Sequence, residues 1–198
     1  MNSTRIGLAR RLAAPTAVVL AVAAAVLWHH LPVPTQIYAP FDVQGSAGSP
    51  VHGRAMAVTA SRVRVAPKAK FVMGPYLTTT IKATGLWVVV DAAVSATHAS
   101  MTPSAELLVG VNSYRPSTRI EAVTASLTVP VQPGIPESGG WAFDVANELV
   151  EPSVTTPFQL RVWTDDGRLD SRLVINLDRP APQHVDVVTV QPPKAGAA

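Results

Sequence analysis

The feature that most constrains this chain is an uncharged, mainly apolar run over residues 12–28. A membrane-spanning helix needs about 20 predominantly apolar residues, with roughly 17 as the lower limit. The run reaches this length of about 20 residues if His29, His30 and Leu31 lie in the membrane interface. The sequence therefore predicts one N-terminal transmembrane helix, a signal-anchor over residues 12–31, preceded by a short cytoplasmic tail over residues 1–11.

A cleaved signal peptide is the alternative for the same segment. Its apolar region is shorter, roughly 7–15 residues, and ends at a small-x-small site. Ala23 and Ala25 supply such a site. However, Val26, Leu27 and Trp28 continue the apolar run beyond it, and a tryptophan beside histidines is typical of an interfacial anchor. These residues favour an uncleaved anchor and keep cleavage as the alternative.

Basic residues indicate how this segment is oriented. Arg5, Arg10 and Arg11 precede it, and the next Lys or Arg along the chain is Arg54. Because basic residues close to a span stay on the cytoplasmic side, we expect the N-terminus to be cytoplasmic. The localisation that follows is the cell membrane, with a single pass and an extracytoplasmic C-terminal domain.

Alanines recur at every fourth position of the segment, at Ala13, Ala17, Ala21 and Ala25. Residues at this spacing share one face of a helix, and small residues on a shared face let two helices approach closely in lipid. The stripe thus predicts a helix-packing face, with the lipid bilayer and another membrane protein as partners. Chance in an alanine-rich segment explains the same residues and is the simpler interpretation.

Net charge gives no support for nucleic acid as a partner. The formal charge of +3 equals that of the three N-terminal arginines, so the rest of the chain is neutral overall, whereas nucleic-acid binding needs a clustered basic face. One local run of basic residues has no acid between Asp42 and Asp91. It either faces anionic lipid headgroups or polymers, or is a solvated edge strand, which we favour. The run comprises Arg54, Arg62, Arg64, Lys68, Lys70 and Lys82.

Catalytic and metal-binding motifs find little support. The sequence has no cysteine, which excludes a disulfide, a thiol nucleophile and a cysteine-based metal site. The five histidines lack the spacings of metal-binding motifs. We therefore expect no cofactor, no metal and no enzyme activity. A serine hydrolase of the envelope is a remote alternative, since catalytic triads are spatial and Ser, His and Asp are all present.

Beyond the anchor, residues 32–53 are rich in Pro, Gly and Ser and predict a flexible stalk. From residue 54 the apolar residues alternate with polar ones, as in half-buried strands. The strongest strand covers residues 86–96, where alternate residues from Leu86 to Ala96 are all apolar and Asp91 falls on the other face. Further strands are expected over residues 106–111, 120–129, 141–145, 158–162 and 169–177.

Turns and tails complete this organisation. The sequence Asp165-Asp166-Gly167 predicts a hairpin turn, because glycine tolerates positive φ. Residues 112–113 predict another turn, and residues 146–149 a single helical turn. Residues 179–198 are a Pro/Ala-rich C-terminal tail in which residues 185–190 add an edge strand at most. Seven or eight strands in one domain predict an all-β chain with a β-sandwich over residues 54–178.

The order of these features resembles the telokin-like, immunoglobulin-like extracellular domain of many Gram-positive and mycobacterial envelope proteins. That family has a strand with a "vvvd.tv" run, a Pro-Gly loop and a "g…FdV" strand. The corresponding segments here are residues 87–94 (WVVVDAAV), 132–134 (QPG) and 140–145 (GWAFDV). The resemblance implies an immunoglobulin-like (telokin-like) β-sandwich on an anchor or signal peptide. It implies no catalytic residues, because the family is mostly of unknown function.

Three tryptophans, Trp87, Trp141 and Trp163, fall within this one small domain. Trp87 and Trp163 lie on strand faces opposite the cleaner apolar stripes, so they plug the ends of the sandwich or form an exposed patch. Exposed apolar patches mark binding sites, which would make these residues a partner or small-ligand patch. We favour the plug and keep the patch as the alternative.

These expectations combine into one functional prediction. The chain is a non-catalytic membrane-anchored extracytoplasmic domain, an accessory or partner-binding subunit of a cell-envelope membrane assembly. The alternative is an autonomous secreted or tethered module that binds a ligand.

Overall fold

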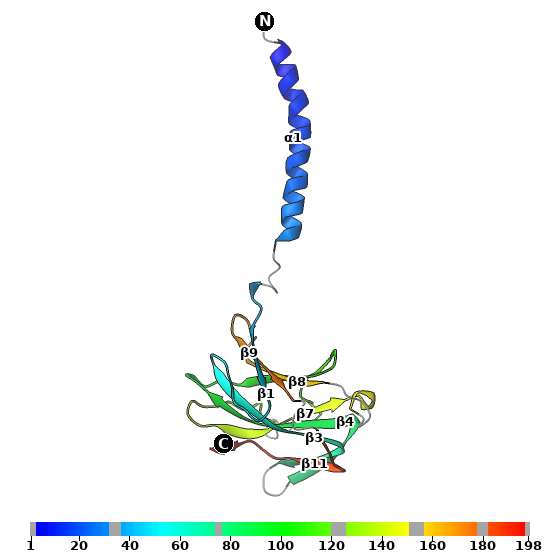
Figure 1. Cartoon of the computed structure of the whole chain (residues 1–198), viewed down its shortest axis with the longest axis vertical. Coiled ribbons are helices and arrows are strands. Elements are labelled where there is room, and N and C mark those ends of the chain that lie inside the picture. Colours follow the sequence, from blue (N-terminus) through cyan, green and yellow to red (C-terminus); the bar gives the residue numbers. More distant parts are fainter. Residues whose placement is uncertain are drawn as a thin grey trace. The chain divides into compact units, whose positions relative to one another are not determined.

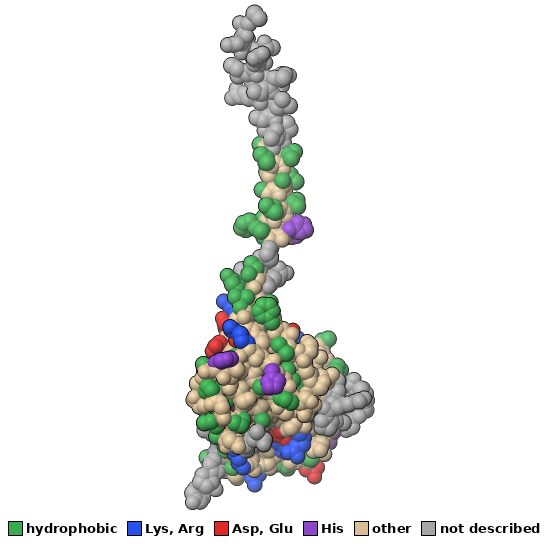
Figure 2. Space-filling view, turned by 60° about the vertical axis from the view of Figure 1, so that its left-hand side comes forward, with side chains coloured by type: hydrophobic (Ala, Val, Ile, Leu, Met, Phe, Trp, Pro, Cys, Tyr) green, Lys and Arg blue, Asp and Glu red, His purple; other side chains and the backbone are tan. Residues whose placement is uncertain are grey.

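The computed structural model describes residues 3–31, 37–73, 77–119, 126–150, 157–177 and 182–196. The chain divides into two compact units, residues 1–39 and residues 40–198. The first unit contains the helix α1 (Ser3–His30). Figure 2 shows hydrophobic side chains along the described part of this helix, with histidine at its end. Within the described residues, no helix combines the length and the apolar character needed to cross a membrane.

The alanine stripe lies on this helix. Ala17, Ala21 and Ala25 are all exposed, as are the neighbouring side chains from residue 17 onward. The side chain of Ala13 lies outside the residues whose side chains are described. The stripe therefore stays a prediction, with three of its four members on an exposed helix.

The second unit is a β-sandwich, as predicted (Figure 1). Its five-stranded sheet has the order β1 (Phe41–Ser46), β9 (Ser171–Asn176), β8 (Phe158–Thr164), β5 (Pro103–Val109) and β6 (Asn112–Tyr114). Its seven-stranded sheet has the order β10 (Gln183–His184), β3 (Met56–Met73), β4 (Leu77–Ala96), β7 (Glu137–Val145) and β12 (Lys194–Ala195). Two further strands pair with β3, namely β2 (Val51–His52) and β11 (Val187–Val190).

The main core lies between the two sheets, and β4 shows how the sequence builds it. Val88, Val90 and Val94 are buried in one apolar cluster, which confirms the predicted apolar face. Alternate residues of a strand point to the same side, so this face meets the inward residues of the other sheet. Those inward residues include Leu107, Val109, Leu160, Val162, Leu173 and Ile175.

A second, smaller apolar cluster covers the opposite face of the seven-stranded sheet. Its members come from β3, β4, β7 and β11, and we call it the outer cluster. The pairing of β3 with β4 shifts register between Ala60 and Arg62 and again between Ala66 and Lys68. Irregularities of this kind bend and twist a strand, which brings the far half of this long hairpin over its own outer face. The outer cluster consists of Ala66, Ala69, Phe71, Ala83, Trp87, Val89, Ala142, Val188 and Val190.

The domain is longer at both ends than the sequence indicated. The expected stalk over residues 32–53 contains β1 and β2, and β1 pairs in parallel with β9 in the five-stranded sheet. The expected tail over residues 179–198 contributes β10, β11 and β12 to the seven-stranded sheet. The edge strand considered over residues 185–190 is present as β11, whereas the stalk prediction was wrong for β1 and β2, and β10 and β12 were not predicted. These short strands depend on partners far away in sequence, not on their own Pro-rich and Gly-rich composition.

Two local predictions were confirmed and two others need correction. A tight turn follows β8, with Gly167 at φ 71° and its N–H bonded to the Thr164 carbonyl at 3.0 Å. A short 3-10 helix, η2 (Asn147–Leu149), occupies the expected helical turn. The turn expected at residues 112–113 is instead the strand β6. Residues 120–125 of the strand expected over 120–129 lie outside the described residues, and residues 126–129 are not a strand.

Candidate functional site

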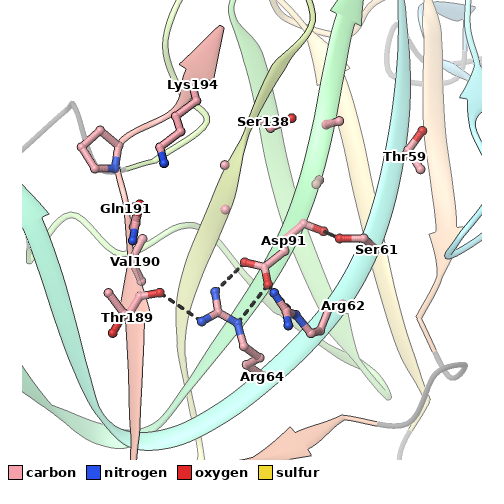
Figure 3. A pocket seen from close by; sticks show the side chains of 15 residues that line it. Thr59, Ser61, Arg62, Arg64, Asp91, Ser138, Thr189, Val190, Gln191 and Lys194 are labelled. Atoms are coloured by element: carbon pink, nitrogen blue, oxygen red, sulfur yellow. Dashed lines mark hydrogen bonds and ion pairs between the residues drawn. The ribbon is translucent and has the colours of Figure 1, made fainter. Parts of the chain in front are cut away.

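A cleft of about 580 Å³ is hollowed into the outer face of the seven-stranded sheet, and we call it the outer cleft. One side is formed by β3, β4 and β7, and the other by the C-terminal segment over residues 189–194 (Figure 3). It lies beside the outer cluster, since Val190 belongs to both. Its charged and hydroxyl side chains are Thr59, Ser61, Arg62, Arg64, Asp91, Ser138, Thr189 and Lys194.

The centre of the outer cleft is an ion pair between Arg64 on β3 and Asp91 on β4. Arg64 Nε donates to Asp91 Oδ2 at 2.9 Å, and Arg64 Nη2 donates to Asp91 Oδ1 at 2.5 Å. The third nitrogen, Nη1, donates to the backbone carbonyl of Thr189 on β11 at 3.0 Å. A two-point pair of this kind fixes the planes of both groups. Arg64 therefore holds three strands together, and its side chain is only 18% exposed.

Arg62 is the second cation on this carboxylate. Its Nε donates to Asp91 Oδ2 at 3.1 Å, and its side chain is 54% exposed. The irregularity between Ala60 and Arg62 turns this segment of β3, and Ser61 donates from its hydroxyl to the Asp91 carbonyl at 3.2 Å. Asp91 thus faces two guanidinium groups, of which one is recessed and one reaches solvent.

Lys194 adds a third cation from the C-terminal side of the outer cleft. Its side chain is exposed on β12, across from Arg62 (Figure 3). Three cations, Arg62, Arg64 and Lys194, and one carboxylate, Asp91, line the outer cleft, so its charged groups sum to +2. The cleft therefore favours negatively charged ligands by simple Coulomb attraction, strengthened where water is partly excluded.

A glycine keeps the floor of the outer cleft open. Gly140 on β7 pairs with Asp91 on β4, so the two residues share a face of the sheet. A Cβ atom at Gly140 would lie 3.4 Å from Asp91 Oδ1 and 3.3 Å from Val89 Cγ1. A Cβ atom would thus contact the carboxylate at an ordinary distance, whereas a longer side chain on this face would extend toward the outer cleft.

A second polar cluster surrounds Asp144 on β7, away from the outer cleft. Its carboxylate accepts the backbone N–H groups of Thr84 and Gly85, each at 3.0 Å to its nearer oxygen, and Arg119 Nη1 at 2.7 Å. Burial raises the pKa of Asp144, but these donors together with the Thr84 hydroxyl outweigh it, and the pKa is lowered. Arg119 also lies 5.8 Å from the centre of the Trp87 ring. We interpret this cluster as structural.

The three tryptophans do not meet and do not form an exposed patch. Trp87 and Trp141 are fully buried, the first in the outer cluster and the second in the main core. Trp87 donates from Nε1 to the Ile81 carbonyl at 3.0 Å and packs edge-on against Phe71. Trp163 is half-buried on the outer face of the five-stranded sheet. The patch prediction was wrong because the bent hairpin covers the strand face that carries Trp87.

The outer cleft was only partly visible in the sequence. Arg62 and Arg64 belong to the basic run noted there, but β3 is not a simple edge strand, because β2, β10 and β11 pair along its other side. Arg54, from the same run, lies elsewhere and pairs with Asp170 at 3.0 Å. Lys194 gave no signal of its own. The available signal was a lone aspartate inside an apolar strand, which needs a cation beside it.

Comparisons with known proteins give one structural similarity. No protein-family model matches the chain, and no curated protein matches it. Among solved structures it is similar to an uncharacterised β-sandwich protein from Clostridium difficile 630, with 13% sequence identity and a TM-score of 0.46. The alignment covers 70% of this chain and 96% of that one. The telokin-like resemblance therefore rests on the sequence motifs alone.

Proposed function

We propose that this chain is a non-catalytic, membrane-anchored domain on the extracytoplasmic side of the cell envelope. In this role it is an accessory or partner-binding subunit of a membrane assembly. The observation that carries the proposal is the outer cleft, a concave and charged surface of about 580 Å³. Ligand sites in proteins are concave and measure roughly 300–1,000 Å³. The cleft is built mainly on paired strands, which position binding groups more accurately than loops do.

The proposed subclass of the sandwich is immunoglobulin-like, and strand order supports it. β4 pairs with β7 in one sheet, while β5 pairs with β8 in the other. The chain thus crosses between the sheets after β4, back after β6 and again after β7, which is the Greek-key arrangement of immunoglobulin-like sandwiches. β9 follows β8 in the same sheet, as the last strand does in that fold.

The proposed anchor is the segment over residues 12–31. Its support is the uncharged run, the arginines that precede it and the 28-residue helix α1 that contains most of it. The part of α1 within this segment, residues 12–30, extends about 28 Å at about 1.5 Å per residue, close to the roughly 30 Å hydrocarbon core of a bilayer. The exposed alanines at 17, 21 and 25 provide the surface on which a partner helix packs.

Co-purification tests this proposal directly. The full-length protein, tagged at its C-terminus, is isolated from its native membranes, and its partners are identified by mass spectrometry. We expect a stoichiometric membrane partner, which is lost when Ala17 and Ala21 are both changed to leucine. Val18→Leu with Val22→Leu is the matched control, because it has the same spacing on another face. Recovery of the protein alone from native membranes would contradict the proposal.

An autonomous ligand-binding module is the second candidate. The outer cleft favours it as well, because its volume of about 580 Å³ lies in the range in which proteins bind small ligands. The same purification separates the two, since a free module would be recovered without partners and with its N-terminus trimmed to Val26, after the Ala23-x-Ala25 site.

A further inference from the structure

We infer that the outer cleft binds an oxyanion, a phosphate or carboxylate group carried by a small solute, through Arg62 and Lys194. The inference rests on the proposed function, since it names the ligand class for the same cleft. Arg64 and Asp91 do not receive the ligand in this arrangement. They form the fixed base on which Arg62 is held.

The hydrogen bonds of the two arginines assign these different roles. All three nitrogens of Arg64 donate to protein acceptors, two to Asp91 and one to the Thr189 carbonyl. Arg62 uses only Nε, and its two terminal nitrogens have no partner among the described residues. The terminal nitrogens of an arginine carry two donors each and match the spacing of oxyanion oxygens. Arg62 is therefore the guanidinium that can receive a ligand.

Lys194 supplies a second charge from the opposite side. Its ammonium has no hydrogen-bond or ion-pair partner among the described residues. Asp91 neutralises one of the three cations in the outer cleft, and the remaining charge of +2 resides on groups with donors to spare. An oxyanion bound between Arg62 and Lys194 would satisfy those donors without breaking any bond within the protein. Binding would then cost little reorganisation.

The shape of the outer cleft favours a small solute over a membrane surface. The receiving side chains of Arg62, 54% exposed, and Lys194 are open to solvent, whereas the base formed by Asp91 and Arg64 is recessed, at 19% and 18% exposed. A flat array of lipid headgroups reaches charges that project from a surface, whereas a solute can enter a hollow. The glycine floor at Gly140 adds depth, because no side chain fills the space beside Asp91.

Calorimetry on the full-length protein in phosphatidylcholine nanodiscs tests the inference, with inorganic phosphate and citrate as probes at low ionic strength. We expect saturable binding whose Kd rises by about fivefold in Arg62→Gln and in Lys194→Gln, the loss of one charge-assisted contact. Arg168→Gln is the matched control: its side chain is 69% exposed on the β8–β9 turn, and the substitution changes the net charge equally. Its Kd should match that of the unaltered protein.

Two results would overturn the inference. One is the absence of binding by either probe, and the other is a control that weakens binding as much as the two cleft variants do. Nanodiscs containing phosphatidylglycerol separate the two sources of the oxyanion. If the Kd of phosphate and citrate is unchanged in these nanodiscs, the ligand is a solute. If the anionic lipid raises that Kd, and the rise disappears in Arg62→Gln, the site binds a lipid headgroup and the assignment to a solute is overturned. Partner recovery from native membranes is measured separately, so a partner found without anion binding removes the inference and leaves the proposed function.

Discussion

Asp42 on β1 and Arg172 on β9 form a two-point ion pair across a parallel ladder, with Nε 2.7 Å and Nη2 2.9 Å from the two carboxylate oxygens. The pair joins the first strand of the sandwich to the last strand of the five-stranded sheet. Its two residues lie 130 positions apart in sequence. The hydrogen bond from Arg172 lowers the pKa of Asp42 more than burial raises it.

The first prediction is that Asp42→Asn lowers the free energy of unfolding by about 1 kcal/mol or less near neutral pH. The side chains are 37% and 26% exposed, so solvent screens the pair. Because the folded pKa is depressed, the stabilisation is present above the unfolded pKa, near 3.8, and is lost as pH falls through the folded pKa. Urea unfolding at neutral and strongly acidic pH measures this. A difference between Asp42→Asn and the unaltered protein that persists in acid would contradict it.

The second prediction concerns Gly85, where β4 lies close to the end of β7. A Cβ atom there would lie 2.0 Å from the backbone carbonyl oxygen of Val145, so the backbone must shift. Gly85→Ala should cost about 3 kcal/mol. Gly48→Ala is the control, because nothing lies within 4 Å of its Cβ position and only its φ of 84° is unfavourable. That control should cost about 1 kcal/mol. Equal unfolding midpoints for the two variants would show that Gly85 has no steric role.

The third prediction separates the roles of the tryptophans. Trp87→Phe keeps the ring in the outer cluster but removes the donor to the Ile81 carbonyl, and should cost about 1–2 kcal/mol. Trp87→Ala empties a buried site and should cost about 3–5 kcal/mol. Trp163→Phe, at a half-buried position, should cost less than either. Thermal unfolding followed by circular dichroism gives the order, and a larger loss at Trp163 would reverse this assignment.

The fourth prediction is that Arg64 and Asp91 are energetically coupled. Arg64→Lys keeps the charge but cannot reproduce the two-point contact together with the bond to the Thr189 carbonyl, and should cost about 1–3 kcal/mol. In a double-mutant cycle with Asp91→Asn, the loss of unfolding free energy in the double variant should be about 1 kcal/mol smaller than the sum of the two single losses. The comparison variant is Arg62→Lys, which should cost less than about 1 kcal/mol because Arg62 is 54% exposed. Strict additivity of the two losses would rule out coupling.

Local pattern was enough to predict the sandwich class and several of its parts. The alternation in β4 identified Val88, Val90 and Val94 as core residues, because a strand with one buried face must alternate. The hairpin turn at Gly167 was equally visible, since its positive φ calls for glycine. These features depend on neighbours only a few residues away, which is the range that sequence patterns describe.

Features that depend on distant partners could not be predicted in this way. β1 has the composition of a linker and becomes a strand because β9 offers it a parallel ladder. Of the two positions that flank Trp87 on its own strand face, Gly85 and Val89, only Val89 is apolar, and the burial of Trp87 also depends on Phe71 and Val188 from other strands. The outer cleft is lined by both Arg62 and Lys194, which are separated by most of the domain's sequence. No residue spacing in the sequence indicates that they line the same cleft.

The parallel ladder between β1 and β9 has a consequence for the order in which the sandwich folds. Synthesis delivers β1 before any strand that can pair with it, and the partner is complete only at Asn176. Until then its backbone donors and acceptors lack the ladder that satisfies them in the finished domain. Such distant pairings also close late in folding, since long loops must be ordered first. The five-stranded sheet therefore acquires this edge as one of the last steps of folding, and a chain shortened before residue 171 would leave β1 without its ladder.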